Sequence, residues 1–215
     1  MPRSALTRRR RDTAPSAARL TPRERRRRLL SQAAQVFAER GYHGTTLELV
    51  AEAAGVPETS LTEDFADKAA LFRAVLDEAR AATVERWRAA TAVLPDPLAK
   101  LHAVAEIYLG TAWTDRPEVA VVCRALAECD AEDIAAPVRS LFLECEAFLA
   151  GILSEGQQMG VFRRQPDPRV GAWQVLHAGL GVATTRPLGL ALRGEPECPA
   201  RAVECLLHGL VKTDV

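Results

Sequence analysis

Residues 29–65 read LLSQAAQVFAERGYHGTTLELVAEAAGVPETSLTEDF, and this stretch indicates the architecture most strongly. Apolar residues recur in it every three or four positions in three separate runs, the period of helices that bury one face. Gly41 ends the first run, Gly55 ends the second, and Leu61 and Phe65 stand four apart in the third. This pattern predicts a helix-turn-helix unit held on a preceding amphipathic helix.

The second of these helices carries start and stop signals. Thr45-Thr46-Leu47-Glu48 has the spacing of a capping box and predicts that Thr45 caps the helix, while Gly55 supplies the left-handed turn residue. Small residues at Ala51 and Gly55 predict that the two short helices cross closely.

Helical signals continue on both sides of this unit. Thr21-Pro22-Arg23-Glu24 predicts the start of the first helix, and Asp67 caps a fourth helix that runs toward Trp87. Amphipathic spacing predicts further helices at about 98–113, 117–129, 134–159, 168–192 and 199–210. We therefore expect an all-α protein of about nine helices, with a basic disordered arm at 1–20, a helix-turn-helix domain at 21–66 and a ligand-binding and dimerisation domain at 67–215.

Charge is balanced overall but divided along the chain. The 215 residues include 28 Lys+Arg and 28 Asp+Glu. Residues 1–30 contain eleven arginines and two acidic residues, a net charge of +9, whereas residues 31–80 have a net charge of −5. An arginine-rich terminus is either a solvated tail or a segment that attracts the phosphates of nucleic acid or of anionic membranes.

Several classes of protein are disfavoured. The chain shows no long apolar stretch and no secretion signal, so we expect a cytoplasmic protein without a membrane span. Its cysteines form no C-x-x-C pair, and phosphate-loop, G-x-S-x-G and H-E-x-x-H motifs are missing, so we expect no metal, no cofactor and no catalytic residues. Glu144 and Glu146, on either side of Cys145, are interpreted as solvated charges.

The residues of the helix-turn-helix stretch resemble those of a known family. They are Leu30-x-x-Ala33-x-x-Val36-Phe37-Ala38-Glu39-Arg40-Gly41-Tyr42, Thr45-Thr46, Val50-Ala51-x-x-Ala54-Gly55-Val56, Leu61, Phe65, Lys68 and Leu71. This set is similar to the N-terminal domain of TetR-family transcriptional regulators. The resemblance implies a homodimer whose third helix enters the major groove, and a C-terminal body that binds a small ligand and changes the spacing of the two DNA-reading domains.

The same resemblance implies where DNA is contacted. Thr45 and Thr46 would offer hydroxyl and N–H groups to a phosphate at the start of the second helix, and Tyr42 and Lys68 match positions that touch the DNA backbone. Thr45 is also interpreted as a simple helix cap. The predicted DNA-binding residues are Arg25, Arg26, Tyr42, Thr45, Thr46, Thr59, Ser60, Thr62 and Lys68.

The third helix departs from the family pattern because it is acidic, with Glu58, Glu63 and Asp64 among its residues. One carboxylate can accept a hydrogen bond from cytosine, but three facing a polyanion oppose binding. In one interpretation the arm and residues 25–28 supply the attraction while Thr59, Ser60 and Thr62 read bases. In the other, the protein keeps the fold, has lost sequence-specific DNA binding, and acts as a ligand- or protein-binding dimer.

Aromatic and histidine side chains on the middle helices are candidates for an effector pocket, with simple core packing as the alternative. They are Trp87, His102, Tyr108, Trp113, Phe142 and Phe148. The helices at 168–192 and 199–210 suit a four-helix dimer interface or an intramolecular contact. Their relevant residues are Val170, Ala172, Trp173, Leu176, Gly179, Leu180, Gly181, Leu206, Leu207 and Leu210, with His177 and His208 on the same helices.

Together these observations predict a dimeric, ligand-responsive repressor. Its partners would be a pseudo-palindromic double-stranded DNA operator, bound by the ligand-free protein, and a small apolar or amphipathic effector that favours release. When bound to DNA it would be associated with the nucleoid.

Overall fold

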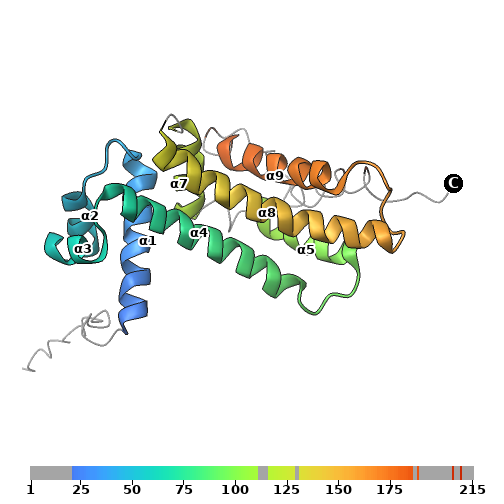
Figure 1. Ribbon diagram of the computed structural model, residues 1–215, viewed down its shortest axis with the longest axis horizontal. Helices are drawn as coiled ribbons and strands as arrows, with labels where there is room; N and C mark the ends of the chain where they lie inside the picture. The colour runs from blue at the N-terminus through green and yellow to red at the C-terminus, as the bar shows by residue number, and fades with distance from the viewer. Residues whose placement is uncertain are drawn as a thin grey trace, which may run out of the picture.

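The computed structural model describes residues 21–110, 116–128 and 131–185, together with residues 188, 205 and 209. Over these residues the chain is all-α, with eight helices and no strand, which confirms the predicted fold class. With the labels of Figure 1, the helices are α1 (Pro22–Arg40), α2 (Leu47–Ala54), α3 (Glu58–Asp64), α4 (Lys68–Thr91), α5 (Pro97–Leu109), α7 (Pro117–Ala127), α8 (Glu132–Gln158) and α9 (Pro168–Thr185). The predicted arm at 1–20, the predicted last helix at 199–210 and Trp113 lie outside the described residues.

Helices α1, α2 and α3, which we call the head, form one end of the molecule (Figure 1). The predicted capping box starts α1: the Thr21 hydroxyl accepts the Glu24 N–H at 3.3 Å, and the Glu24 carboxylate accepts the Thr21 N–H at 2.8 Å. Phe37, Val50 and Leu61 are almost fully buried, so each helix of the head contributes to one shared core. This burial holds the short helices α2 and α3, which are too short to be stable alone.

The start of α2 differs by one residue from the prediction. Thr46 is the N-cap, since its hydroxyl accepts the Leu49 N–H at 3.3 Å. Thr45 instead donates its own hydroxyl to the carbonyl of Gly41 at 2.7 Å and is 1% exposed. At the other end Gly55 has the predicted left-handed conformation, but a Cβ there would meet no atom within 4 Å, so the close helix crossing predicted at this glycine is wrong.

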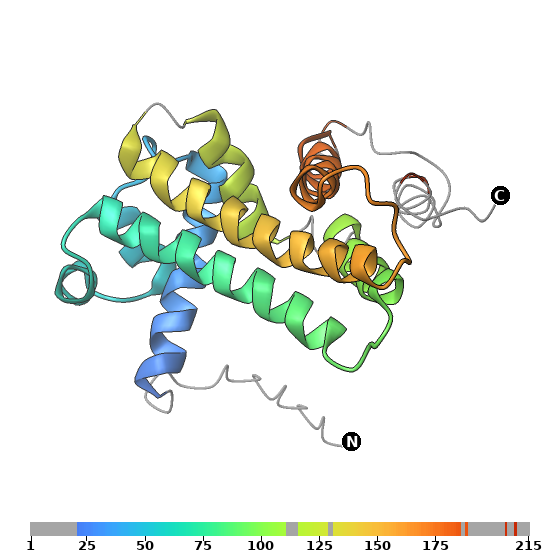
Figure 2. The ribbon, with the colours of Figure 1, turned by 45° about the vertical axis from the view of Figure 1, so that its right-hand side comes forward.

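Helices α4 to α9, which we call the body, pack around the two longest helices, α4 and α8. Both views show α4 and α8 running side by side, with α5 and α9 on the remaining faces of α8 (Figures 1 and 2). Trp87 of α4 is fully buried at their centre and meets the Tyr108 ring edge-on, with ring centroids 5.5 Å apart. The result is a hydrophobic core that continues into the head.

Helix α9 uses several residues of the predicted dimer interface inside its own subunit. Ala172 and Leu176 are buried, and Gly179 lies directly against the Tyr108 ring, where a Cβ would overlap the ring atoms. For these three residues the intramolecular alternative is confirmed, and Leu176 and Gly179 contact Tyr108 of α5. Gly181 is exposed and has open space around it.

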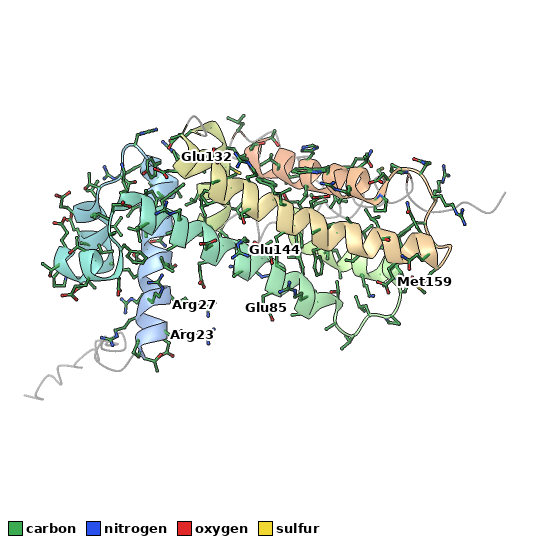
Figure 3. All side chains as sticks on the ribbon, in the orientation of Figure 1. Arg23, Arg27, Glu85, Glu132, Glu144 and Met159 are labelled. Carbon is green, nitrogen blue, oxygen red and sulfur yellow. The ribbon has the colours of Figure 1, made fainter. Side chains whose placement is uncertain are left out.

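The two carboxylates around Cys145 are not the solvated charges that the sequence suggested. Glu144, which Figure 3 labels between α8 and α4, forms an ion pair with Arg80. Glu146 is 4% exposed and accepts hydrogen bonds from the guanidinium of Arg169, with Nε to Oε1 at 2.5 Å. Each of the two carboxylates has a partner on a neighbouring segment, Arg80 of α4 for Glu144 and Arg169 of α9 for Glu146.

Within the part of the chain that the structure describes, no helix is long and apolar enough to cross a membrane.

Candidate DNA-binding face and effector cavity

Helix α3 presents a polar surface to solvent. Leu61 is fully buried and anchors the helix to the head, whereas Thr59, Ser60 and Thr62 are exposed. The Thr62 hydroxyl donates to the carbonyl of Thr59 at 3.0 Å, so its oxygen keeps lone pairs for base amino groups. These three hydroxyl residues can reach base edges if α3 enters a major groove.

The same helix also exposes its acidic residues. Glu58, Glu63 and Asp64 are all solvent-exposed, and α3 contains no Lys or Arg. At about 4 Å from a phosphate, each carboxylate costs on the order of 1 kcal/mol in water, so positive charge must come from elsewhere.

Lys68, at the start of α4, contacts Tyr42, which lies in the loop between α1 and α2. The Lys68 ammonium donates to the Tyr42 carbonyl at 2.9 Å and sits 4.5 Å from the centroid of its ring. Both side chains are half-buried. The lysine thereby ties the start of α4 to the α1–α2 loop and holds a positive charge beside the head.

The threonines before α2 have different roles. Thr46 is exposed and caps the helix, so its hydroxyl remains at the surface next to the first N–H groups of α2. Thr45 is buried with its hydroxyl bonded to Gly41, so it is not available to a phosphate. The alternative reading of Thr45 as the helix cap is not met either, because Thr46 takes that position.

Two arginines of α1 were predicted to face DNA, and both are exposed. The Arg26 guanidinium lies over the Phe65 ring, 4.8 Å from its centroid, which brings a positive charge to the C-terminal end of α3. Arg25 lies on the first turns of the same helix. The structure thus places positive charge on the side of α1 that adjoins the acidic helix.

Helix α7 makes a contact with the head that sequence reasoning missed, and we call it the α7 clasp. The Glu128 carboxylate accepts the N–H of Tyr42 at 2.7 Å, although the two residues are 86 positions apart. Arg124 donates to the carbonyl of Ala38 at 3.3 Å and lies 3.7 Å from Glu128. The spacing of Arg124 and Glu128 is a visible i,i+4 pair, but nothing local shows that it points at the head.

Gly41 makes the clasp possible. Its φ of 73° belongs to the left-handed region, and a Cβ there would collide with the Glu128 carboxylate. The glycine that ends α1 therefore serves two purposes, because it turns the chain and leaves room for the end of α7.

The body contains an apolar cavity of about 40 Å³ between α4, α5, α7, α8 and α9. Its walls include Thr83, Tyr108, Glu118, Val119, Val122, Cys123, Leu141, Phe142, Cys145, Leu176 and Leu180. Burial raises the pKa of the Cys145 thiol to about 12, with a smaller contribution from Glu144. The thiol therefore stays protonated, and this wall of the cavity is uncharged at neutral pH.

The predicted effector-binding residues divide between this cavity and the core. Tyr108 and Phe142 line the cavity. Trp87 and Phe148 pack against each other with ring centroids 5.8 Å apart, and His102 is half-buried on α5. These three are not among the lining residues, and Trp87 and Phe148 belong to the core instead.

The structure thus joins a helix-turn-helix head to a helical body that contains an apolar cavity. Residues 29–75 match the family described as "Bacterial regulatory proteins, tetR family". This N-terminal segment is therefore similar to the helix-turn-helix domain of TetR-family transcriptional regulators.

Two curated relatives match part of the chain. The HTH-type transcriptional regulator RutR of Escherichia coli K12 is 37% identical over 82 residues, which cover 38% of this chain and 37% of RutR. The HTH-type transcriptional activator FasR of Mycolicibacterium smegmatis is 36% identical over 90 residues, which cover 42% of this chain and 41% of FasR. The matched region therefore spans less than half of either relative.

The likeness of the whole fold comes from solved structures. The transcriptional regulator FadR from Bacillus subtilis, solved in complex with stearoyl-CoA, has a TM-score of 0.76 at 21% identity. The match covers 86% of this chain and 98% of FadR. At this identity the comparison establishes the fold of head and body.

Proposed function

We propose that this protein is a ligand-responsive transcriptional repressor that binds a pseudo-palindromic operator as a homodimer. In this proposal Thr59, Ser60 and Thr62 read bases, while Arg25, Arg26, Thr46 and Lys68 contact phosphates. A small apolar or amphipathic effector enters the body and favours release from DNA in the cytoplasm.

The observation that carries this proposal is the position of α7. Its first half supplies Val119 and Val122 to the walls of the apolar cavity, and its C-terminal end holds the head through Glu128. One rigid helix therefore touches both the effector cavity and the DNA-reading unit. A displacement at one end has a physical route to the other.

The size of the cavity supports the same conclusion. About 40 Å³ is space for only a few water molecules, since one water needs roughly 10–15 Å³ of such volume. An effector larger than that must push the walls apart. Because α7 is one of these walls, binding would move the helix that clasps the head, and coupling free energies of this kind are typically about 1–3 kcal/mol.

The test is selection of genomic DNA fragments by the purified full chain, followed by sequencing of the bound fraction. A recovered palindrome with half-sites one or more helical turns apart supports the proposal. Effectors are then sought by screening small apolar and amphipathic molecules for release of that operator. Recovery of no common sequence would contradict operator binding, and operator binding that no effector changes would contradict ligand response.

Support for the homodimer comes from an open apolar groove of about 330 Å³ on the outer side of α8 and α9. Its lining includes Val138, Phe142, Leu143, Trp173, His177 and Leu180. Leu143 is 46% exposed, and Val170 on α9 is 52% exposed. We propose that a second copy covers this face. Light scattering of the wild type and of Leu143→Glu tests this. We expect the wild type to be a dimer and the variant to dissociate more readily. If both proteins are monomers, the proposal is refuted.

The exposed carboxylates of α3 favour one alternative, in which the fold is kept and sequence-specific DNA binding is lost. In that case the protein acts as a ligand- or protein-binding dimer. The double variant Glu63→Gln/Asp64→Asn distinguishes the two functions in a DNA-binding assay. Stronger binding to the operator that the wild type already selects supports the repressor, whereas binding that exists only in the variant supports the alternative.

A further inference from the structure

A second cavity, of about 210 Å³, lies at the seam between head and body. Three arginines from three segments line it: Arg27 of α1, Arg86 of α4, and Arg116 at the start of α7. We call this space the arginine cavity. Figure 3 labels Arg27 in the N-terminal half of α1. Two glutamates, Glu78 and Glu118, also line it.

Positive charge exceeds negative charge around this cavity, with three arginines against two glutamates. Arg27 lies 3.8 Å from Glu78, and the two side chains are 78% and 45% exposed. An ion pair this long and this exposed contributes little, so water can replace it at small cost. The outer part of the cavity is therefore open to a competing anion.

The inner part of the cavity brings two guanidinium groups together. Arg86 is half-buried, and its pKa is lowered first by burial and then by the neighbouring charge of Arg116, while Glu118 acts in the opposite direction. Arg116 therefore repels Arg86, and Glu118 attracts it. An oxyanion between them would reduce their repulsion and could accept hydrogen bonds from both planar guanidinium groups.

The arginine cavity also adjoins the apolar cavity. Glu118, at the beginning of α7, belongs to the walls of both. The volume is many times the roughly 10–15 Å³ that a single water requires, so a phosphate group fits with some of its hydration. A molecule with an anionic head and an apolar tail would find a matching environment for each part at adjacent places along α7.

We propose that the arginine cavity is a phosphate-binding subsite that takes the phosphate head of an amphipathic effector whose tail enters the apolar cavity. The inference rests on the proposed function in assigning the apolar cavity to the effector. The phosphate would contact α1, α4 and α7 at once, and so would join the head to the body. A phosphate could also bind there as a free ion, and the experiment separates these two sources.

The experiment is calorimetric titration of the full chain, without DNA, with octyl phosphate, octanol and inorganic pyrophosphate in a dilute chloride buffer. Octyl phosphate is expected to bind the wild type more tightly than octanol. Arg116→Gln and Arg86→Gln are each expected to weaken octyl phosphate roughly tenfold or more, the cost of one charge-assisted hydrogen bond, and to leave octanol unchanged. Arg88→Gln is the matched control, because Arg88 is an exposed arginine on α4 outside the cavity lining, 3.8 Å from Glu144.

Each outcome has a defined meaning. If pyrophosphate binding depends on Arg116 and octyl phosphate binds no more tightly than pyrophosphate, the cavity is a site for free phosphate, and the proposal of an amphipathic effector is overturned. Equal affinities for octyl phosphate and octanol, or equal effects of the Arg116 and Arg88 variants, overturn the subsite. Far-ultraviolet circular dichroism of each variant confirms folding. Since no DNA is present, a failure here is distinct from a failure of operator binding.

Discussion

Removing the α7 clasp should weaken the attachment of the head to the body. The perturbation is Glu128→Ala, which deletes the carboxylate that accepts the Tyr42 N–H at 2.7 Å and lies 3.7 Å from Arg124. A hydrogen bond to a charged group stabilises by about 1.5–3 kcal/mol, and partial exposure of Glu128 places the loss at about 1–2 kcal/mol. Such a loss changes the ratio of docked to undocked heads by a factor of about 5–30.

Two assays measure this loss. Hydrogen exchange at the Tyr42 amide should accelerate by about that factor, because the N–H no longer has its acceptor. Affinity for the operator selected by the wild type should fall by up to the same factor, since a dimer needs both heads docked in one geometry. Fluorescence anisotropy with a labelled operator gives the second quantity.

The control for this prediction is Glu132→Ala. Glu132 is exposed, lies at the start of α8 and pairs with Arg139 of the same helix at 3.1 Å. It should leave both the Tyr42 amide and the operator affinity unchanged. Unaltered exchange and affinity in Glu128→Ala, or equal changes in both variants, would refute the role of α7 as the connection between cavity and head.

Three further predictions concern the body. Arg169→Ala should lower the free energy of unfolding more than Glu146→Gln, because it leaves a carboxylate that is 4% exposed without its cation. Urea unfolding of both variants measures this order, and the reverse order would contradict it. Cys145 should resist iodoacetamide in the native protein at pH 8, since burial raises its thiol pKa to about 12, and it should react once the protein unfolds. As the pH rises above about 9, the thiol ionises in the unfolded chain but not in the folded one, so this group should progressively lower the stability of the fold. Gly179→Val should destabilise by about 1–3 kcal/mol, because its side chain would overlap the Tyr108 ring, and thermal unfolding equal to wild type would show that the contact can relax.

Local sequence signals were sufficient to predict most of the fold. Thr21 and Gly41 cap the two ends of α1, as the capping box and the glycine indicate. Asp67 caps the start of α4, as its side chain also predicts. The start of α2 could not be resolved in this way, because Thr45 and Thr46 are both good caps. Only the folded turn shows that the Gly41 carbonyl takes the hydroxyl of Thr45.

The candidate site was less predictable, because its contacts join residues far apart in the chain. The partner of Glu146 is Arg169 on the segment that begins α9, and the partner of Glu128 is the Tyr42 amide. A carboxylate on a helix looks the same in the sequence whether it faces water or a distant donor. The exposure of the reading residues on α3 was easier to predict, since only Leu61 of its residues is apolar.

The claim on which the account depends is that an acidic reading helix can be held on DNA by positive charge ahead of it. The most direct measurement is operator affinity across a series of salt concentrations, for the full chain and for a chain lacking residues 2–20. The logarithm of affinity should fall with the logarithm of salt concentration by about 0.9 per neutralised phosphate. Residues 2–20 contain six arginines, so their removal should flatten the slope by up to about 5. Equal slopes for the two chains, or no binding by the full chain even at the lowest salt, would contradict the account.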